Sequence, residues 1–166
     1  MQRALFIGRF QPFHNAHLVD VMNILKYYDE IIIGVGSSQE KNTFENPFSY
    51  NERKQMISNT LKKNKIKKFR ICPIPDLYND IKWVGYILKN IPKFDMLYSG
   101  NEWTIRCFRK HKIKAKKIKL SKGISSTKIR AMMTKGKEWQ KLVPKEAAIY
   151  IKRIKGVERI KRLSNK

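Results

Sequence analysis

Apolar runs and amphipathic stretches alternate along the first 120 residues. The runs suited to buried parallel strands lie at 4–8, 30–36, 69–74, 94–99 and, more weakly, 114–120. Apolar residues at helical spacing predict helices at 17–25 and 52–61, and Ser49 and Glu52 have the spacing of a capping box before the second helix. This alternation predicts an α/β fold with right-handed βαβ units and a doubly wound parallel sheet of five strands.

After Ser121 the pattern becomes all-helical. Apolar positions predict helices over 124–129, 147–154 and 157–163, and no low-complexity linker precedes them. A chain of 166 residues is long enough for one compact domain and short for two ordinary ones. We therefore predict a single domain over residues 1–166, in which the C-terminal helices pack against the sheet.

The composition is that of a globular protein, with 42% hydrophobic residues. No stretch reaches the ~18 uncharged apolar residues of a membrane span, and the N-terminus lacks the features of a signal or transit peptide. These observations predict a cytoplasmic protein. Cys72 and Cys107 lack CxxC spacing and lie in apolar surroundings, so we expect them to pack as small hydrophobic residues.

A large basic excess distinguishes the chain. Its 37 Lys and Arg residues against 13 Asp and Glu give a net charge of +24, which attracts nucleic acid, anionic surfaces or phosphorylated small molecules. Many lysines fall in runs at 62–68 and 110–119, where they interleave with apolar residues as on the solvent face of a helix end or an edge strand. A solvated basic surface explains these runs at least as well as an RNA-binding tract does.

The stretch GRFQPFHNAH, residues 8–17, follows the first predicted strand and opens the first predicted helix. In an open α/β sheet, ligands bind outside the carboxyl ends of the strands. Gly8 lets a ligand approach the backbone, and Arg9 adds a cation. His14 and His17 are one helical turn apart and place two imidazole donors at a helix N-terminus, which favours anions. This stretch therefore predicts a phosphate-binding site.

The histidine pair has two other interpretations. Zinc-binding histidines of metalloproteases are four residues apart with a glutamate between them, and no further Cys or His cluster completes a tetrahedral set here. Alternatively, both rings are satisfied polar groups near a helix cap, which is the better interpretation of an isolated His-x-x-His.

A second stretch, GISSTKIRAMM at 123–133, favours the phosphate-binding interpretation of the histidine pair. Ser125, Ser126 and Thr127 suit the cap and first turn of a helix, and Arg130 follows. Hydroxyl groups, free N–H groups and an arginine at a helix start form another phosphate cradle. By itself such a stretch is most often an ordinary helix N-terminus, because Ser and Thr are common caps.

Together, GRFQPFHNAH and ISSTKIR resemble the two signatures of the archaeal type of nicotinamide-nucleotide adenylyltransferase, within the nucleotidyltransferase superfamily that carries the HIGH motif. Further segments resemble the same family in the family's order, at 45–53, 75–84, 98–101, 139–144 and 154–163. The resemblance covers nearly the whole chain and implies a Rossmann-like nucleotidyltransferase fold. It also implies transfer of AMP from ATP to nicotinamide mononucleotide (NMN), which gives NAD and pyrophosphate by direct in-line attack without a covalent intermediate.

The resemblance also implies the partners. ATP and NMN are the substrates, Mg²⁺ or another divalent cation accompanies ATP, and no protein side chain is assigned as a metal ligand. Relatives of this type tend to be hexamers, so the resemblance implies a homo-oligomer, although repulsion between highly basic subunits opposes it. Neither a membrane nor a nucleic acid is expected as a partner.

The resemblance assigns site residues to three roles. The catalytic residues are Arg9, His14, His17 and Arg130. The ATP-binding residues are Gly8, Arg9, Phe10, His14, His17, Ser99, Gly100, Asn101, Ile124, Ser125, Ser126, Thr127 and Arg130. The NMN-binding residues are Asp76, Asp80 and Trp83. The resemblance implies that Trp83 stacks on the nicotinamide ring. The alternative interpretation is a core residue, because a tryptophan on an amphipathic helix is usually buried.

Three positions depart from the family's pattern. Ala16 stands where glycine is usual, so its methyl group is expected to crowd the adenine. Residues 131–132 stand where further arginines are common, so phosphate affinity is expected to be weaker unless Lys122 or Lys128 compensates. Asp80 stands where asparagine is frequent, which leaves the recognition of the amide open.

Two alternative functions stay open. A sister adenylyltransferase would act on another phosphorylated acceptor, such as nicotinate mononucleotide, FMN or phosphopantetheine. A basic RNA-binding module, suggested by the charge, would bind RNA in a salt-sensitive way that the loss of His17 leaves unchanged.

Overall fold

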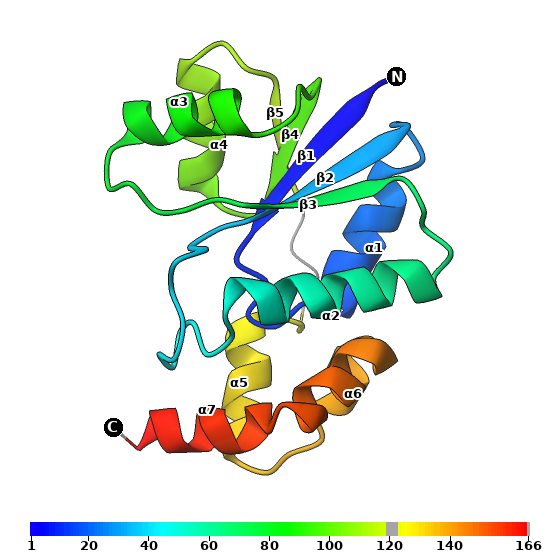
Figure 1. Ribbon diagram of the computed structural model, residues 1–166, viewed down its shortest axis with the longest axis vertical. Coiled ribbons are helices and arrows are strands. Elements are labelled where there is room, and N and C mark those ends of the chain that lie inside the picture. Colours follow the sequence, from blue (N-terminus) through cyan, green and yellow to red (C-terminus); the bar gives the residue numbers. More distant parts are fainter. Residues whose placement is uncertain (119–122, 166) are drawn as a thin grey trace. The chain divides into compact units, whose positions relative to one another are not determined.

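The computed structural model describes residues 1–118 and 123–165. Its described strands form one parallel sheet in the order β3-β2-β1-β4-β5 (Figure 1). They are β1 Arg3–Gly8, β2 Glu30–Val35, β3 Phe69–Pro73, β4 Met96–Ser99 and β5 Ala115–Lys117. The predicted five-stranded α/β fold is confirmed. The end of the fifth predicted run, at 119–120, lies outside the described residues, as does Lys122.

The helices are α1 Asn15–Ile24, α2 Tyr50–Lys63, α3 Asp80–Asn90, α4 Glu102–Lys110, α5 Ser126–Thr134, the 3-10 helix η1 Gln140–Leu142, α6 Lys145–Arg153 and α7 Gly156–Ser164. Those predicted at 17–25, 52–61, 124–129, 147–154 and 157–163 are present with shifted ends. The capping box before α2 is confirmed, because the Glu52 N–H donates to the Ser49 Oγ and the Ser49 N–H donates to the Glu52 carboxylate. None of the helices within the described ranges is long and apolar enough to span a membrane.

The chain folds into two compact units, each built from separated segments. The first consists of Met1–Arg9, Asp20–Ser38 and Lys68–Leu120 and contains the sheet. The second consists of Phe10–Val19, Gln39–Lys67 and Ser121–Lys166 and contains α2 and the helices from α5 to α7. The chain passes from the first unit to the second at residue 10, directly after β1. The single domain over residues 1–166 stays a prediction.

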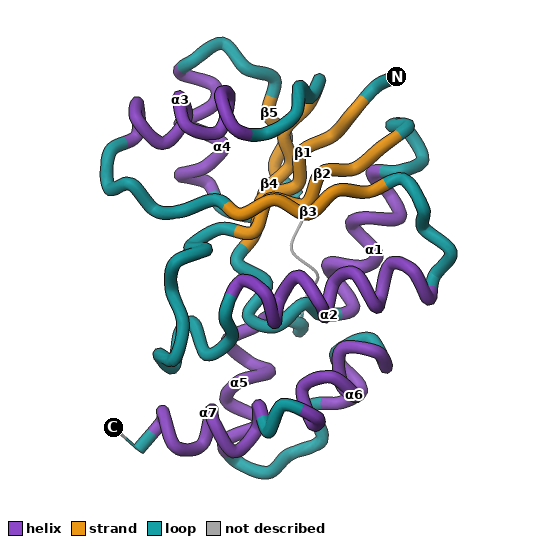
Figure 2. Tube along the Cα trace, viewed as in Figure 1, coloured by secondary structure: helices purple, strands orange, loops and turns teal. Residues whose placement is uncertain are grey.

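In the first unit, α3 and α4 pack together against the sheet (Figure 2). Their shared core contains Leu5, Ile7, Ile32, Leu97, Trp83, Val84, Ile87, Ile105 and Phe108. Because α3 follows β3 and α4 follows β4, both helices begin at the carboxyl edge of the parallel sheet. Cys107 is buried in this core and Cys72 packs against it, as predicted for small hydrophobic residues.

In the second unit, α2, α5, α6 and α7 enclose a separate core. Its buried side chains include Phe48, Met56, Ile129, Met133, Trp139, Val143, Ala147, Ile151 and Ile160. Gly156 opens α7 because a Cβ there would lie 2.9 Å from the Phe48 ring and 3.0 Å from the Ile151 carbonyl oxygen. Arg159 of α7 donates two hydrogen bonds to the Glu52 carboxylate of α2, at 2.7 and 2.8 Å. This bidentate ion pair fixes α7 against α2.

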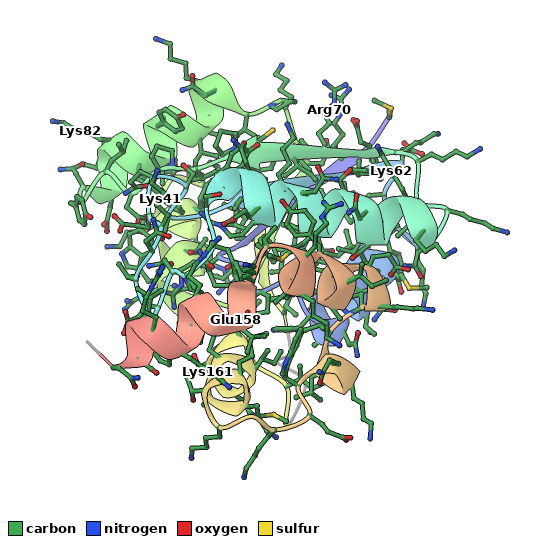
Figure 3. The ribbon with its side chains drawn as sticks, turned by 60° about the horizontal axis from the view of Figure 1, so that its bottom comes forward. Lys41, Lys62, Arg70, Lys82, Glu158 and Lys161 are labelled. Carbon is green, nitrogen blue, oxygen red and sulfur yellow. The ribbon has the colours of Figure 1, made fainter. Side chains whose placement is uncertain are left out.

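The described lysines of both basic runs lie at the surface. All those of the run at 62–68 are exposed, and Lys62 is labelled in Figure 3. The described lysines of the second run, up to residue 118, are exposed as well. Their exposure supports the interpretation of both runs as solvated surfaces.

Candidate active site

The loop that follows β1 is buried and unusually constrained. Phe10 has a positive φ of 52°, a conformation that costs a non-glycine residue free energy and that clusters at functional sites. The peptide bond between Gln11 and Pro12 is cis. Gln11 is 1% exposed, and its side-chain amide donates to the Phe48 carbonyl oxygen at 2.8 Å and accepts from the Phe48 N–H at 3.0 Å. These two hydrogen bonds anchor the loop to the segment that precedes α2.

His14 and His17 cap the start of α1 reciprocally. The backbone N–H of His14 donates to Nδ1 of His17 at 3.2 Å, and the backbone N–H of His17 donates to Nδ1 of His14 at 3.4 Å. The rings stack with centroids 3.5 Å apart and planes 13° apart. Because Nδ1 of each ring accepts a hydrogen bond, the proton of each neutral ring lies on Nε2. Each neutral ring therefore carries its N–H on Nε2.

Burial keeps both rings neutral. His14 is 6% exposed, and burial lowers its pKa from 6.5 to about 4. Burial also lowers the pKa of His17 well below 6.5, and the charge of a protonated His14 would lower it further. The Phe10 and Phe13 rings contribute to this apolar setting, with centroids 4.8 and 5.4 Å from that of His17. At neutral pH both rings are therefore uncharged.

The neutral state of His14 makes the fold sensitive to acid. Between pH 6.5 and 4 this residue is protonated in the unfolded chain but not in the folded protein, so the free energy of unfolding falls as pH falls. The loss amounts to roughly 2 kcal/mol at pH 5. In urea unfolding at pH 7 and pH 5, we expect the wild type to lose more stability over this range than His14→Gln.

The difference between the wild type and His14→Gln isolates the contribution of His14 to the pH dependence of stability. Burial raises the pKa of Asp20 from 3.8 to about 6, so this carboxyl group stabilises the folded protein as pH falls through 6. Asp20 is present in both proteins, and its contribution cancels in their difference. Equal losses of stability in the wild type and His14→Gln would contradict the prediction.

The start of α5 is bonded to the same loop. Ser125 is the N-cap, as predicted, and its Oγ accepts from the Lys128 N–H at 3.2 Å. Ser126 Oγ donates to the Pro12 carbonyl oxygen at 3.0 Å. Arg130 is 4% exposed, and its guanidinium donates to the Gln11 carbonyl oxygen at 2.9 Å. The second unit thus brings the two signature stretches together.

The other predicted residues of this helix start differ in exposure. Ser125 and Thr127 are exposed, whereas Ile124 is half-buried. The Lys128 ammonium group donates to the Gly123 carbonyl oxygen at 2.8 Å, within its own segment. The guanidinium of Arg130 lies 5.6 Å from the centre of the Phe44 ring. Binding of the β- and γ-phosphates by these residues stays a prediction.

The predicted adenosine contacts lie in the first unit, at the end of β4. Ser99 Oγ donates to the Ile7 carbonyl oxygen of β1 at 3.1 Å and accepts from the Asn101 N–H at 3.1 Å. Asn101 caps α4 by accepting from the Trp103 N–H at 2.9 Å. Gly100 is half-buried between them. Since β1 and β4 are the neighbours at which the strand order reverses, these residues lie at the switch point where α/β sheets bind ligands.

Gly8 and Arg9 complete the predicted residues at this edge. Gly8 ends β1 and is half-buried, and its carbonyl oxygen accepts from the Gly36 N–H at 2.9 Å. Arg9 is exposed. Their contact with ATP stays a prediction.

The predicted NMN contacts also lie in the first unit. Trp83 is 4% exposed and belongs to the core between α3, α4 and the sheet. The carboxylate of Asp80 is hydrogen-bonded to the thiol of Cys107, whose pKa is raised by burial first and by this carboxylate second. Asp76 is half-buried in the loop before α3.

Gln11 and Trp103 are two residues near the predicted sites to which no sequence motif gives a role. Gln11 is a polar residue within a buried aromatic loop, and its partner Phe48 is distant in sequence. Trp103 packs against Trp83 with ring centroids 4.9 Å apart. Its only sequence signal is its position two residues after the predicted contact Asn101.

The described ranges contain no group of three or more His, Cys, Asp or Glu side chains that could hold a metal ion. The donor set around the first signature consists of N–H groups, which suit phosphate oxygens. Such a site fits a divalent cation that is held mainly by phosphate oxygens and water, as Mg²⁺ often is in nucleotide enzymes.

Comparison with known proteins identifies the family. Residues 5–132 match the family model described as cytidylyltransferase-like. Nicotinamide-nucleotide adenylyltransferase from Thermococcus kodakarensis is 36% identical over 168 residues, which cover 99% of this chain and 89% of that relative. The protein of the same name from Thermoplasma acidophilum is 41% identical, with 98% and 92% covered. The chain belongs to the nicotinamide-nucleotide adenylyltransferase family.

A solved structure agrees with this assignment. A bifunctional NMN adenylyltransferase/ADP ribose pyrophosphatase from Francisella tularensis, complexed with AMP and a Mn ion, matches with a TM-score of 0.78 and 25% identity. The match covers 99% of this chain and 53% of that one, so this chain spans about half of its length. The predicted membership of the nicotinamide-nucleotide adenylyltransferase family, and with it the class of nucleotidyltransferase enzymes, is confirmed.

Proposed function

We propose that the protein transfers AMP from ATP to NMN and forms NAD and pyrophosphate. Family membership supports this activity, and one structural observation carries the proposal for this chain. The starts of α1 and α5 are joined by the hydrogen bonds from Ser126 to Pro12 and from Arg130 to Gln11, beside two neutral histidines. Two helix N-termini and two imidazole rings protonated at Nε2 in one unit support a proposed site for a chain of phosphate groups.

The reaction needs no nucleophile from the protein. A phosphate oxygen of NMN forms a bond to the α-phosphorus of ATP while the bond from that phosphorus to pyrophosphate breaks. The protein then has to hold two polyanions in line and to stabilise the negative charge that grows on the transferred and leaving groups. In our proposal, His14 and His17 donate to these oxygens from Nε2, and the hydroxyls of Ser125 and Thr127 bind the leaving phosphates.

A divalent cation bound with ATP would neutralise part of the triphosphate charge. The Mn ion and AMP in the Francisella structure are consistent with a divalent cation at such sites. We propose Mg²⁺ as the ion used by this protein. A cytoplasmic location and a homo-oligomer, a hexamer by resemblance, stay predictions.

A coupled assay tests the proposed reaction. Purified protein with ATP, NMN and Mg²⁺ is expected to form NAD, which alcohol dehydrogenase converts to NADH for detection at 340 nm. NMN is expected to be used better than nicotinate mononucleotide, FMN or phosphopantetheine when AMP transfer is followed directly. Reactions without ATP or without Mg²⁺ are the controls.

Two results would overturn the proposal. Rapid turnover of one of the other acceptors with none of NMN would assign a sister activity. Salt-sensitive RNA binding without turnover of any acceptor would favour the RNA-binding alternative.

A further inference from the structure

A cavity of about 300 Å³ lies in the first unit, between the second half of α1 and the strands β4 and β5. The helix side of the cavity is formed by Asp20, Asn23, Ile24 and Tyr27. Their spacing of three to four residues places them on one side of α1 and of the turn that follows it. None of the residues that line the cavity is predicted to bind ATP or NMN, so the proposed reaction gives this cavity no role.

Asp20 is a carboxylate without a protein partner in this cavity. It is half-buried, and among the described residues no hydrogen bond or ion pair reaches its oxygens. Burial alone raises its pKa from 3.8 to about 6, so the carboxylate is still the main form at pH 7. In a chain with 37 Lys and Arg residues, a half-buried carboxylate that has no cation beside it calls for an explanation. A binding group for a ligand provides one.

The strand side of the cavity supplies an aromatic ring and a cation. Tyr98 of β4 and Lys116 of β5 both line it and are register partners in the parallel sheet. The Tyr98 ring packs edge to face on Tyr28, with centroids 6.0 Å apart, and the two side chains are hydrogen-bonded. These contacts fix the Tyr98 ring before any ligand binds. Lys116 is exposed on the edge strand of the sheet, where its ammonium group meets solvent.

These groups suit a nucleotide better than an amine. An amine would pair with the Asp20 carboxylate, but the lysines of β5 and the net charge of +24 disfavour a cationic ligand. A planar base with N–H donors, linked to a phosphate, satisfies the carboxylate, the aromatic ring and the ammonium group together. Pockets for small molecules range from about 300 to 1,000 Å³. A cavity of about 300 Å³ therefore suits the base and sugar of a mononucleotide.

We propose that this cavity binds a guanine nucleotide, with Asp20 accepting from the base and Lys116 binding the phosphate. Guanine has two neighbouring donors, N1–H and the 2-amino group, which can meet both oxygens of one carboxylate. Adenine has its 6-amino group next to the acceptor N1, which would face the second carboxylate oxygen. The side-chain oxygen of Asn23 accepts from Lys26 at 2.9 Å, so the amide nitrogen is the atom that can donate to guanine O6. This site is independent of the proposed transfer of AMP.

Isothermal titration calorimetry with GMP tests the site. The titration contains saturating NAD, the product that occupies the proposed ATP and NMN sites. GMP is expected to bind about 10-fold more tightly than IMP, which lacks the 2-amino group, and also more tightly than AMP. Guanosine lacks the phosphate and is expected to bind more weakly than GMP at low ionic strength.

Two variants separate the contacts to the base and to the phosphate. Asp20→Asn is expected to weaken GMP binding about 10-fold and to bring the affinities for GMP and IMP within about threefold, because an amide has one acceptor oxygen. Lys116→Ser is expected to weaken the binding of GMP but not that of guanosine. Asp29→Asn is the matched control, because Asp29 is exposed in the same unit and accepts from the Gln2 N–H outside the cavity. Thermal unfolding of each variant checks that the fold is retained.

Four results would overturn the inference. They are no detectable binding of GMP, equal affinities for GMP, IMP and AMP, binding of GMP that Asp20→Asn leaves unchanged, and binding of GMP that NAD abolishes. The last of these would assign GMP to the active site. Because calorimetry needs no turnover, a protein that binds GMP through Asp20 but forms no NAD would contradict the proposed reaction and keep this site.

Discussion

Replacing His17 with alanine is expected to lower the turnover of NAD formation by about 10²–10³ with the fold retained, because one preorganised donor to the reacting phosphate is lost. The His17 ring accepts from the His14 N–H through Nδ1, so the proton of the neutral ring lies on Nε2, the nitrogen that the proposal assigns to the substrate. Its pKa is lowered well below 6.5 by burial, so the donor is the neutral ring. The coupled NAD assay under saturating substrates measures the change in kcat.

His111 supplies the matched control. It is the third histidine of the chain, is exposed at the end of α4, and has Nδ1 2.9 Å from the Cys107 carbonyl oxygen. His111→Ala is expected to change turnover less than twofold. A loss of less than threefold in His17→Ala would contradict the assignment of His17 to the reacting phosphates.

Two further variants separate the roles of the ring nitrogens. An asparagine at position 17 places its side-chain oxygen near the position of Nδ1, where it can accept from the His14 N–H. A glutamine reaches further and can place an N–H near the position of Nε2. If the donor at Nε2 is what matters, His17→Gln keeps more turnover than His17→Asn. The opposite order would mean that the ring serves mainly as a cap of α1.

The central strands were predictable because their buried residues are consecutive in the sequence. β2 is buried along its whole length, and its sequence is the nearly continuous apolar run at 30–36. The start of α2 was equally clear, since a capping box lies within four adjacent residues. The start of α1 was predicted two residues late, because here histidine nitrogens take the place of the usual Ser, Thr, Asp or Asn cap. The first residue of a helix can therefore be predicted from the sequence when its N-cap is one of the common capping residues.

The predicted site depended on partners that are far apart in the chain. Spacing indicated that Ser125 caps α5, but only the structure shows that Ser126 and Arg130 bond to carbonyl groups of the loop after β1. Arg130 was predicted as a phosphate ligand, and the hydrogen bond to Gln11 gives it a structural role as well. For Trp83, the sequence allowed either a core residue or a stacking residue. Its exposed fraction of 4% places it in the core, and stacking on NMN stays a prediction.

Gln11→Met is expected to lower the free energy of unfolding by about 2 to 4 kcal/mol, the largest stability effect predicted for this loop. Methionine has nearly the shape of glutamine but neither donates nor accepts in the same way, so the buried N–H and carbonyl groups of Phe48 lose their side-chain partner. Urea unfolding at pH 7 measures the change in the free energy of unfolding, and an unchanged m-value would show that the unfolded state is the same in both proteins.

Gln55→Met is the control, because the side chain of Gln55 is exposed and, among the contacts described, bonds only to Asn59. Its free energy of unfolding is expected to change by no more than about 0.5 kcal/mol. Because Gln11 also accepts from Arg130 through its backbone, which the substitution keeps, the two signature stretches should stay joined. Equal stability of Gln11→Met and Gln55→Met would show that the amide contributes no net stability and that apolar packing alone holds the loop.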